Sequence, residues 1–261
     1  MALTDYDARS YTFEGKTRSV FVRGNGPAII VMHELPGMTP ECLALGDRLA
    51  SRGFSVYLPL FFGSAGQKSS NLRNLGYLVR FCISREWNAL ALGVTSPVAN
   101  WVRALARQAH QECGGKGIGA IGMCLTGSFV IPLLLDPVVL APVSLQPARP
   151  LPLTRSRRRD LGVSPDDLEG ARERLEQGHL TILGCRFTND RVCPPEKFEE
   201  MSRCFGGTFE RIEIDSSKGN PHGIDTKAHS VLTGNYCDAE DHPTRKAFER
   251  VVELFTLRLL G

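Results

Sequence analysis

Cys124 is the residue whose surroundings in the sequence best fit covalent chemistry. It is the centre of a Gly-x-Cys-x-Gly pattern, GMCLTG at 122–127, which directly follows an apolar run at 118–121 and precedes a helical pattern. At a sharp strand-to-helix turn the central residue takes a strained backbone conformation, and the neighbouring glycines leave room for it. The helix N-terminus favours a thiolate there. The pattern predicts Cys124 as a nucleophile, and a buried, inert cysteine is the alternative.

A thiol nucleophile needs a base, and that base needs a group to orient it. Asp190 follows an apolar run at 180–187, and His222 lies in a Pro-His-Gly turn after a further run that ends near residue 214. Side chains at the carboxyl edge of a parallel sheet face the ligand crevice. His229 and His242 lie beyond the loop in which we expect the base. We therefore predict a triad of Cys124, Asp190 and His222.

The loop after the first apolar run, HELPG at 33–37, should help to stabilise negative charge. A tetrahedral intermediate beside the nucleophile needs two backbone N–H donors, and we predict those of Leu35 and Leu125. His33 and Glu34 could begin a zinc-binding helix, but Gly37 occupies the partner position and Pro36 would break that helix. The sequence therefore predicts no metal here.

A Gly-x-Gly-x-x-Gly pattern at 117–122 resembles a dinucleotide-binding fingerprint. Its glycines lie before and within the apolar run instead of in the turn after it, so they do not fit that role. Eight cysteines occur, and no two have the Cys-x-x-Cys spacing of zinc ribbons or thioredoxin-like motifs. We predict a protein without cofactor, with free thiols.

Short apolar or β-branched runs alternate with helical patterns along the chain. Parallel strands need long crossovers, so this alternation predicts an α/β fold with a mostly parallel central sheet and helices on both faces. A segment at 11–22 suits an edge strand or hairpin, and we expect one domain over 1–261. The expected strands are 28–32, 54–60, 118–121, 138–145, 180–187 and 209–214, and the expected helices are 39–52, 97–110, 125–135, 165–177, 194–204 and 244–259.

Composition and charge narrow the class of partner. A formal net charge of +3 is too small for a field that would recruit nucleic acid. The first ten residues do not look like a secretion leader, and no uninterrupted apolar run reaches the roughly 18 residues of a membrane span. These features predict a cytoplasmic protein that binds neither nucleic acid nor membrane.

The motifs at 31–37, 119–127 and 221–223, with the Asp190 loop, resemble those of the dienelactone hydrolase family. This is a carboxymethylenebutenolidase-like branch of the α/β-hydrolase superfamily, and cysteine in place of the usual serine is the specific part of the likeness. The resemblance implies an α/β-hydrolase fold and a Cys-His-Asp triad. It also implies that Glu34 contacts the thiol and takes its proton when substrate binds.

The expected activity is hydrolysis of a small ester or lactone through an acyl-enzyme thioester. Family members that act on dienelactone hold the substrate carboxylate with arginines, and Arg85 is our candidate for such a contact. Trp87 could wall an apolar pocket or pack in the core. Three alternatives stay open: an acyltransferase or thioesterase using the same site, an inactive hydrolase-like binding protein, and a redox sensor built on Cys124. The sequence predicts no oligomeric state.

Overall fold

The computed structural model describes residues 3–68, 76, 87, 92–150 and 152–261. These residues form an eight-stranded sheet in the order β1-β2-β4-β3-β5-β6-β7-β8, and all pairings from β4 to β8 are parallel. The mostly parallel sheet expected from the alternating apolar runs is confirmed. The strands are β1 (Asp7–Phe13), β2 (Lys16–Arg23), β3 (Ala28–Met32), β4 (Ser55–Pro59), β5 (Ile118–Met123), β6 (Val139–Leu145), β7 (Ile182–Phe187) and β8 (Phe209–Ile214).

The edge hairpin expected at 11–22 is present as β1 and β2, which pair antiparallel with each other, and β2 pairs antiparallel with β4. Its tight turn uses Glu14 and Gly15, whose φ angles of 51° and 71° are both positive. Such a turn matches the right-handed twist of the two strands. The hairpin therefore extends one edge of the parallel sheet.

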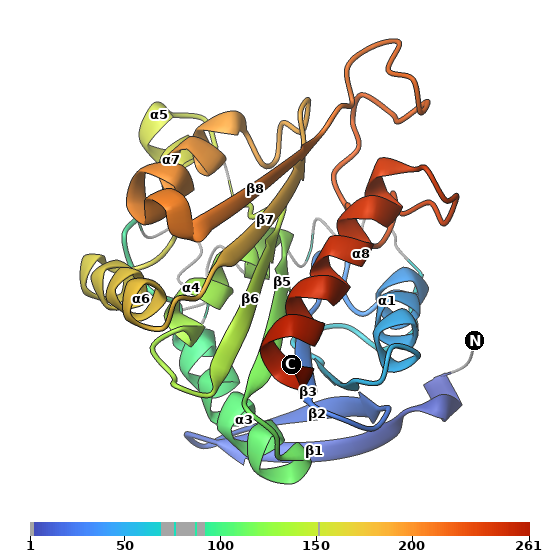
Figure 1. The fold of residues 1–261 in the computed structure, drawn as a ribbon, viewed down its shortest axis with the longest axis vertical. Helices are drawn as coiled ribbons and strands as arrows, with labels where there is room; N and C mark the ends of the chain where they lie inside the picture. Colours follow the sequence, from blue (N-terminus) through green and yellow to red (C-terminus); the bar gives the residue numbers. More distant parts are fainter. Residues whose placement is uncertain (1–2, 69–75, 77–86, 88–91, 151) are drawn as a thin grey trace.

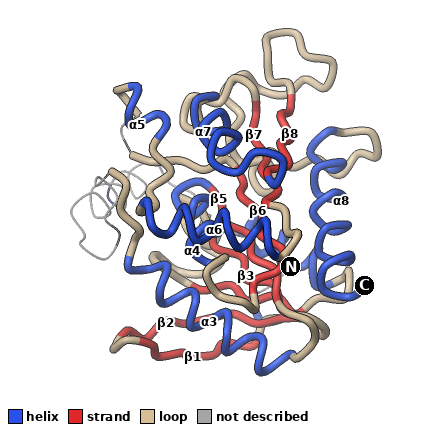
Figure 2. The backbone as a smooth tube through the Cα atoms, turned by 60° about the vertical axis from the view of Figure 1, so that its left-hand side comes forward, coloured by secondary structure: helices blue, strands red, loops and turns tan. Residues whose placement is uncertain are grey.

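Helices cover both faces of the sheet (Figure 1). Helices α1 and α8 pack on one face, and α3, α4, α6 and α7 pack on the other, where Figure 2 shows α3, α4 and α6 in front of the strands. The side chains of β3 alternate between the two cores, as the period of a strand requires. The helices are α1 (Pro40–Ala50), α3 (Pro97–Cys113), α4 (Val130–Leu133), α5 (Arg155–Arg159), α6 (Pro165–Gln177), α7 (Pro195–Phe205) and α8 (Pro243–Phe255).

The segment after β5 differs from the single helix expected at 125–135. Residues Cys124–Phe129 form a 3-10 helix, and α4 continues it for one short turn. Pro132 has no N–H to donate, and Gly127 has a low helix propensity, so a long α-helix is not favoured here. No helix within the described part of the chain combines the length and apolar character needed to cross a membrane.

Candidate active site

The turn that carries Cys124 has the strained geometry that the sequence predicts. Cys124 directly follows β5 and has a φ of 51°, which a residue with a side chain rarely adopts. A Cβ on Gly122 would lie 2.2 Å from the carbonyl oxygen of Thr126, and one on Gly127 would lie 2.6 Å from Cα of Pro147. Both contacts involve backbone, so both positions require glycine.

A buried hydroxyl fixes this turn to the neighbouring strand. Thr126 Oγ1 accepts a hydrogen bond from the N–H of Met123 at 2.9 Å and lies 2.9 Å from the carbonyl oxygen of Met32, to which it can donate. Met32 ends β3, so the turn and the loop after β3 are held together. This contact places Cys124 beside Glu34.

His229 is the histidine that meets the predicted acid. Its Nδ1 lies 2.6 Å from Oδ2 of Asp190, and the other carboxylate oxygen accepts the N–H groups of Val192 at 2.8 Å and Cys193 at 3.1 Å. Asp190 lies in the loop after β7 and is buried. The side chain of Asn235 accepts the backbone N–H of His229 at 3.1 Å, which supports the histidine loop.

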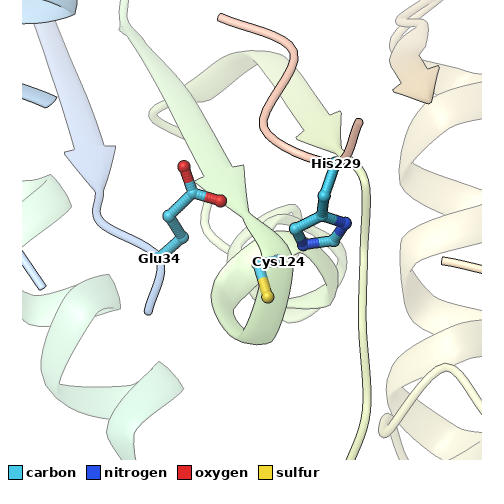
Figure 3. A group of neighbouring side chains, drawn as sticks. All are labelled: Glu34, Cys124 and His229. Atoms are coloured by element: carbon cyan, nitrogen blue, oxygen red, sulfur yellow. The ribbon is translucent and has the colours of Figure 1, made fainter. Parts of the chain in front are cut away.

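Cys124, His229 and Glu34 converge from three separate segments, as Figure 3 shows. The sulfur, a ring nitrogen of His229 and a carboxylate oxygen of Glu34 all lie within 4.8 Å of one another. His229 Nε2 is buried and has no hydrogen-bond partner among the residues that the structure describes. Since Asp190 engages Nδ1, Nε2 is the nitrogen that can exchange a proton with the sulfur or with a substrate.

The electrostatics of this group favour a charged imidazole. Burial lowers the pKa of His229, but the negative charge of Cys124 and the hydrogen bond that the ring donates to Asp190 raise it more, so that its pKa lies well above 6.5. A proton on the imidazole is the counterpart of a thiolate on the sulfur. The arrangement can therefore supply an activated sulfur nucleophile and an acid–base group beside it.

Glu34 is held by three side chains. Its Oε2 accepts Ser230 Oγ at 2.9 Å and Gln146 Nε2 at 3.2 Å, and its Oε1 accepts the hydroxyl of Thr233. An ionised carboxylate accepts hydrogen bonds only, and it suits three donors. The sequence did not single out Ser230, Gln146 or Thr233, because each comes from a segment whose position relative to Glu34 depends on the fold.

The structure brings His229, and not the predicted base His222, to Asp190. His222 is exposed, and its ring packs edge-on against that of His242, with the centroids 5.5 Å apart. The chain after β8 makes an exposed turn through His222 and only then returns over Cys124, which places His229 at the site. A sequence signal existed. His229 lies among apolar residues such as Ala228 and Val231, both buried in the structure, whereas the neighbours of His222 are polar or turn-forming.

Leu35 and Leu125, the predicted oxyanion donors, directly follow Glu34 and Cys124, respectively. Trp87 is buried, and its ring packs against Phe61 at 5.7 Å and Phe129 at 5.8 Å between centroids. It is thus a core side chain behind the turn that carries Cys124. Arg85, the predicted anion contact, lies outside the described residues.

His33 supports the loop after β3. Its Nε2 accepts the N–H of Phe61 at 3.1 Å, and its Nδ1 lies 3.1 Å from the carbonyl oxygen of Glu34. This pattern requires a neutral ring with its proton on Nδ1. Burial agrees with it, since it lowers the pKa of His33 to about 4. His33 therefore positions Glu34 and Leu35.

A cavity of about 520 Å³ borders Asp190 on the protein surface, and its walls carry Arg158, Arg191 and Lys227. Neither Cys124 nor His229 lines it. We call Cys124, His229 and Glu34 the reacting group. The cavity lies beside this group, and the geometry of the group, not the cavity, defines the candidate site.

Comparisons with known proteins bear on the family and the fold of the chain. The family model described as "Dienelactone hydrolase family" matches residues 17–259. No curated protein sequence matches the chain. Among solved structures, a dienelactone hydrolase of Anabaena variabilis has a TM-score of 0.63 at 12% identity, covering 97% of this chain and 98% of its own.

Two further structures extend the comparison. An esterase of Pyrococcus furiosus has a TM-score of 0.60 at 15% identity, covering 99% of this chain and 95% of its own. A dienelactone hydrolase-like promiscuous phosphotriesterase from metagenomic libraries has a TM-score of 0.59 at 16% identity, covering 97% and 98%. At these identities the structural likeness shows the fold, which is that of α/β hydrolases.

Proposed function

The chain belongs to the dienelactone hydrolase family, and we propose that it hydrolyses a small ester or lactone through Cys124. The observation that carries the proposal is the convergence of Cys124, whose backbone is strained at φ 51°, and His229, whose Nδ1 lies 2.6 Å from Asp190. This set contains a nucleophile, a base and an orienting acid, which are the parts that acyl transfer to water needs. The family assignment supports a hydrolase of carboxylic ester type.

In the proposed mechanism the Cys124 thiolate attacks the carbonyl carbon of the substrate. The carbonyl oxygen takes the negative charge, and the backbone N–H groups of Leu35 and Leu125 donate hydrogen bonds to it. Collapse breaks the bond to the leaving oxygen, which takes a proton from the His229 imidazolium. A thioester on Cys124 remains.

Water completes the cycle. Neutral His229, oriented by Asp190, removes a proton from water as the water oxygen attacks the thioester carbonyl. The second tetrahedral intermediate expels the Cys124 thiolate and releases the carboxylic acid. One water is consumed, one ester bond is broken, and the thiolate–imidazolium pair is restored.

Glu34 is the second proton acceptor of the proposal. Its carboxylate lies within 4.8 Å of the sulfur and is held there by Ser230 and Thr233. We propose that it takes the proton of a neutral Cys124 thiol when substrate binds and passes it to the His229 ring, which gives the thiolate–imidazolium pair that begins the reaction. The reverse transfer after product release restores the thiol. A resting thiol would be less open to oxidation than a thiolate.

Sulfur as the nucleophile sets a preference for the leaving group. A thiolate is itself a good leaving group, so a poor alkoxide would return to the carbonyl faster than it departs, whereas a stabilised anion leaves. The proposal therefore favours enol esters, aryl esters and lactones whose ring oxygen leaves as an enolate.

A hydrolysis screen with short aryl esters and unsaturated lactones tests the function. We expect turnover by the wild type, a thioester adduct on Cys124 in mass spectra of quenched reactions, and loss of turnover in Cys124→Ala and His229→Ala. His222→Ala is the matched control and should keep the wild-type rate. Full activity in Cys124→Ala, or no hydrolysis of any member of the panel, would overturn the proposal.

A further inference from the structure

The reacting group has the composition of a zinc site. A sulfur, an imidazole nitrogen and a carboxylate oxygen lie within 4.8 Å of one another, and these are the donor types that proteins use for Zn²⁺. Cys124 and Glu34 are buried, and His229 Nε2 is a buried atom with no hydrogen-bond partner among the described residues. A metal ion at this point would take the place of the proton between Nε2 and the sulfur of Cys124.

The surrounding contacts resemble those that orient metal ligands. The carboxylate of Asp190 engages Nδ1 of His229 at 2.6 Å, so Nε2 is the nitrogen left for a metal ion once its proton is lost. A carboxylate behind a ligating histidine fixes the ring and strengthens the ligand. Glu34 Oε1 accepts one hydrogen bond, from Thr233, and so retains capacity for a second partner.

We propose that Zn²⁺ binds to Cys124 Sγ, His229 Nε2 and a carboxylate oxygen of Glu34, with water as the fourth ligand, and that it reversibly inhibits the enzyme. The one proton that Cys124 and the His229 ring hold between them passes to solvent as the Zn–S and Zn–N bonds form. Bound zinc occupies both the nucleophile and the base, so acylation cannot begin. The mixed sulfur, nitrogen and oxygen donors fit Zn²⁺ and exclude Mg²⁺ and Ca²⁺, which prefer oxygen ligands. Binding is independent of the proposed function, whereas inhibition rests on it.

Zinc binding can be measured directly on the full chain after treatment with a chelator. The protein is titrated with zinc chloride against a chromophoric chelator, and hydrolysis of an aryl ester is followed over the same range. We expect one zinc per chain at this site, inhibition that follows its occupancy, recovery after addition of EDTA, and no effect of magnesium chloride. Cys124→Ala and Cys124→Ser should lose this zinc, and their thermal unfolding confirms that they are folded.

Cys237→Ala is the matched control, because Cys237 is an exposed free thiol outside the group. It should bind and respond to zinc like the wild type. Thr233→Val removes the hydroxyl that holds Glu34 Oε1 and should weaken zinc binding about 10- to 100-fold, as loss of a ligand's supporting contact does.

Each outcome separates the two proposals. Equal zinc affinity in the wild type and Cys124→Ala, or hydrolysis that saturating zinc leaves unchanged, overturns the zinc site while leaving the hydrolase intact. One tightly bound zinc that requires Cys124, in a protein that hydrolyses no ester or lactone, supports the site and overturns the hydrolase.

Discussion

His229 and Asp190 are joined at 2.6 Å between Nδ1 and Oδ2, although they lie on loops after different strands. This contact fixes which ring nitrogen of the histidine faces the sulfur. His229 belongs to the same loop as Ser230 and Thr233, which donate hydrogen bonds to Glu34. One loop therefore positions both proton acceptors of the proposed reaction.

Replacement of His229 by asparagine should lower kcat/KM for an aryl ester by roughly 10²- to 10⁴-fold, the usual contribution of a positioned general acid–base group. His222→Asn should leave kcat/KM within about twofold of the wild type, because His222 is exposed and contacts His242 instead of the reacting group. Steady-state kinetics of the two variants decide between the two histidines. The reverse ranking would restore His222 as the base.

The charge state of His229 should depend on the sulfur beside it. After burial, which lowers its pKa, the largest influence is the negative charge of Cys124, which raises it. Cys124→Ala should therefore lower the pKa of His229, as followed by the imidazole resonances in NMR titrations. Because the folded-state pKa lies above 6.5, the charged ring stabilises the fold fully below pH 6.5, and this contribution is lost as pH rises through the folded-state pKa. An unchanged pKa in Cys124→Ala would contradict the pairing of sulfur and ring.

Much of the fold follows from local patterns. The continuous apolar runs of β3 and β5 require burial on both faces, and the Gly-x-Cys-x-Gly motif contains the close backbone contacts of its own turn. These features are encoded within a few residues, and they predict the sheet and the position of Cys124.

The rest of the site depends on the path of a long loop. The proposed base was assigned to the first histidine after β8, but the chain passes through an exposed turn before it returns at His229. Motif spacing does not determine how far a loop travels before it packs. The contacts of Ser230, Thr233 and Gln146 with Glu34 join segments far apart in sequence, so no local pattern predicts them.

His33 should make the stability of the protein depend on pH. Burial lowers its pKa from 6.5 to about 4 in the folded state, so below pH 6.5 the unfolded chain binds a proton that the folded chain does not. Stability should therefore fall by about 3 kcal/mol as pH decreases from 7 to 4. Urea unfolding of the wild type and His33→Gln across this range measures it. The variant should show the smaller fall, and parallel curves would refute the assignment.

Gly122→Ala tests the close backbone contact that shapes the turn at Cys124. The new Cβ would lie 2.2 Å from the carbonyl oxygen of Thr126, which cannot move without displacing the turn. We expect a loss of stability of at least about 1–3 kcal/mol, typical of overpacking, and a loss of activity because Cys124 moves with Thr126. Thermal unfolding and kinetics measure the two effects.

Gly207→Ala provides the matched control for this substitution. Gly207 is exposed, and a Cβ there meets no atom within 4 Å. The same chemical change at this position should alter the free energy of unfolding by less than about 0.5 kcal/mol and leave the aryl esterase rate unchanged. If Gly122→Ala behaved like Gly207→Ala, the close approach of Thr126 would not be what holds Cys124 in its strained conformation.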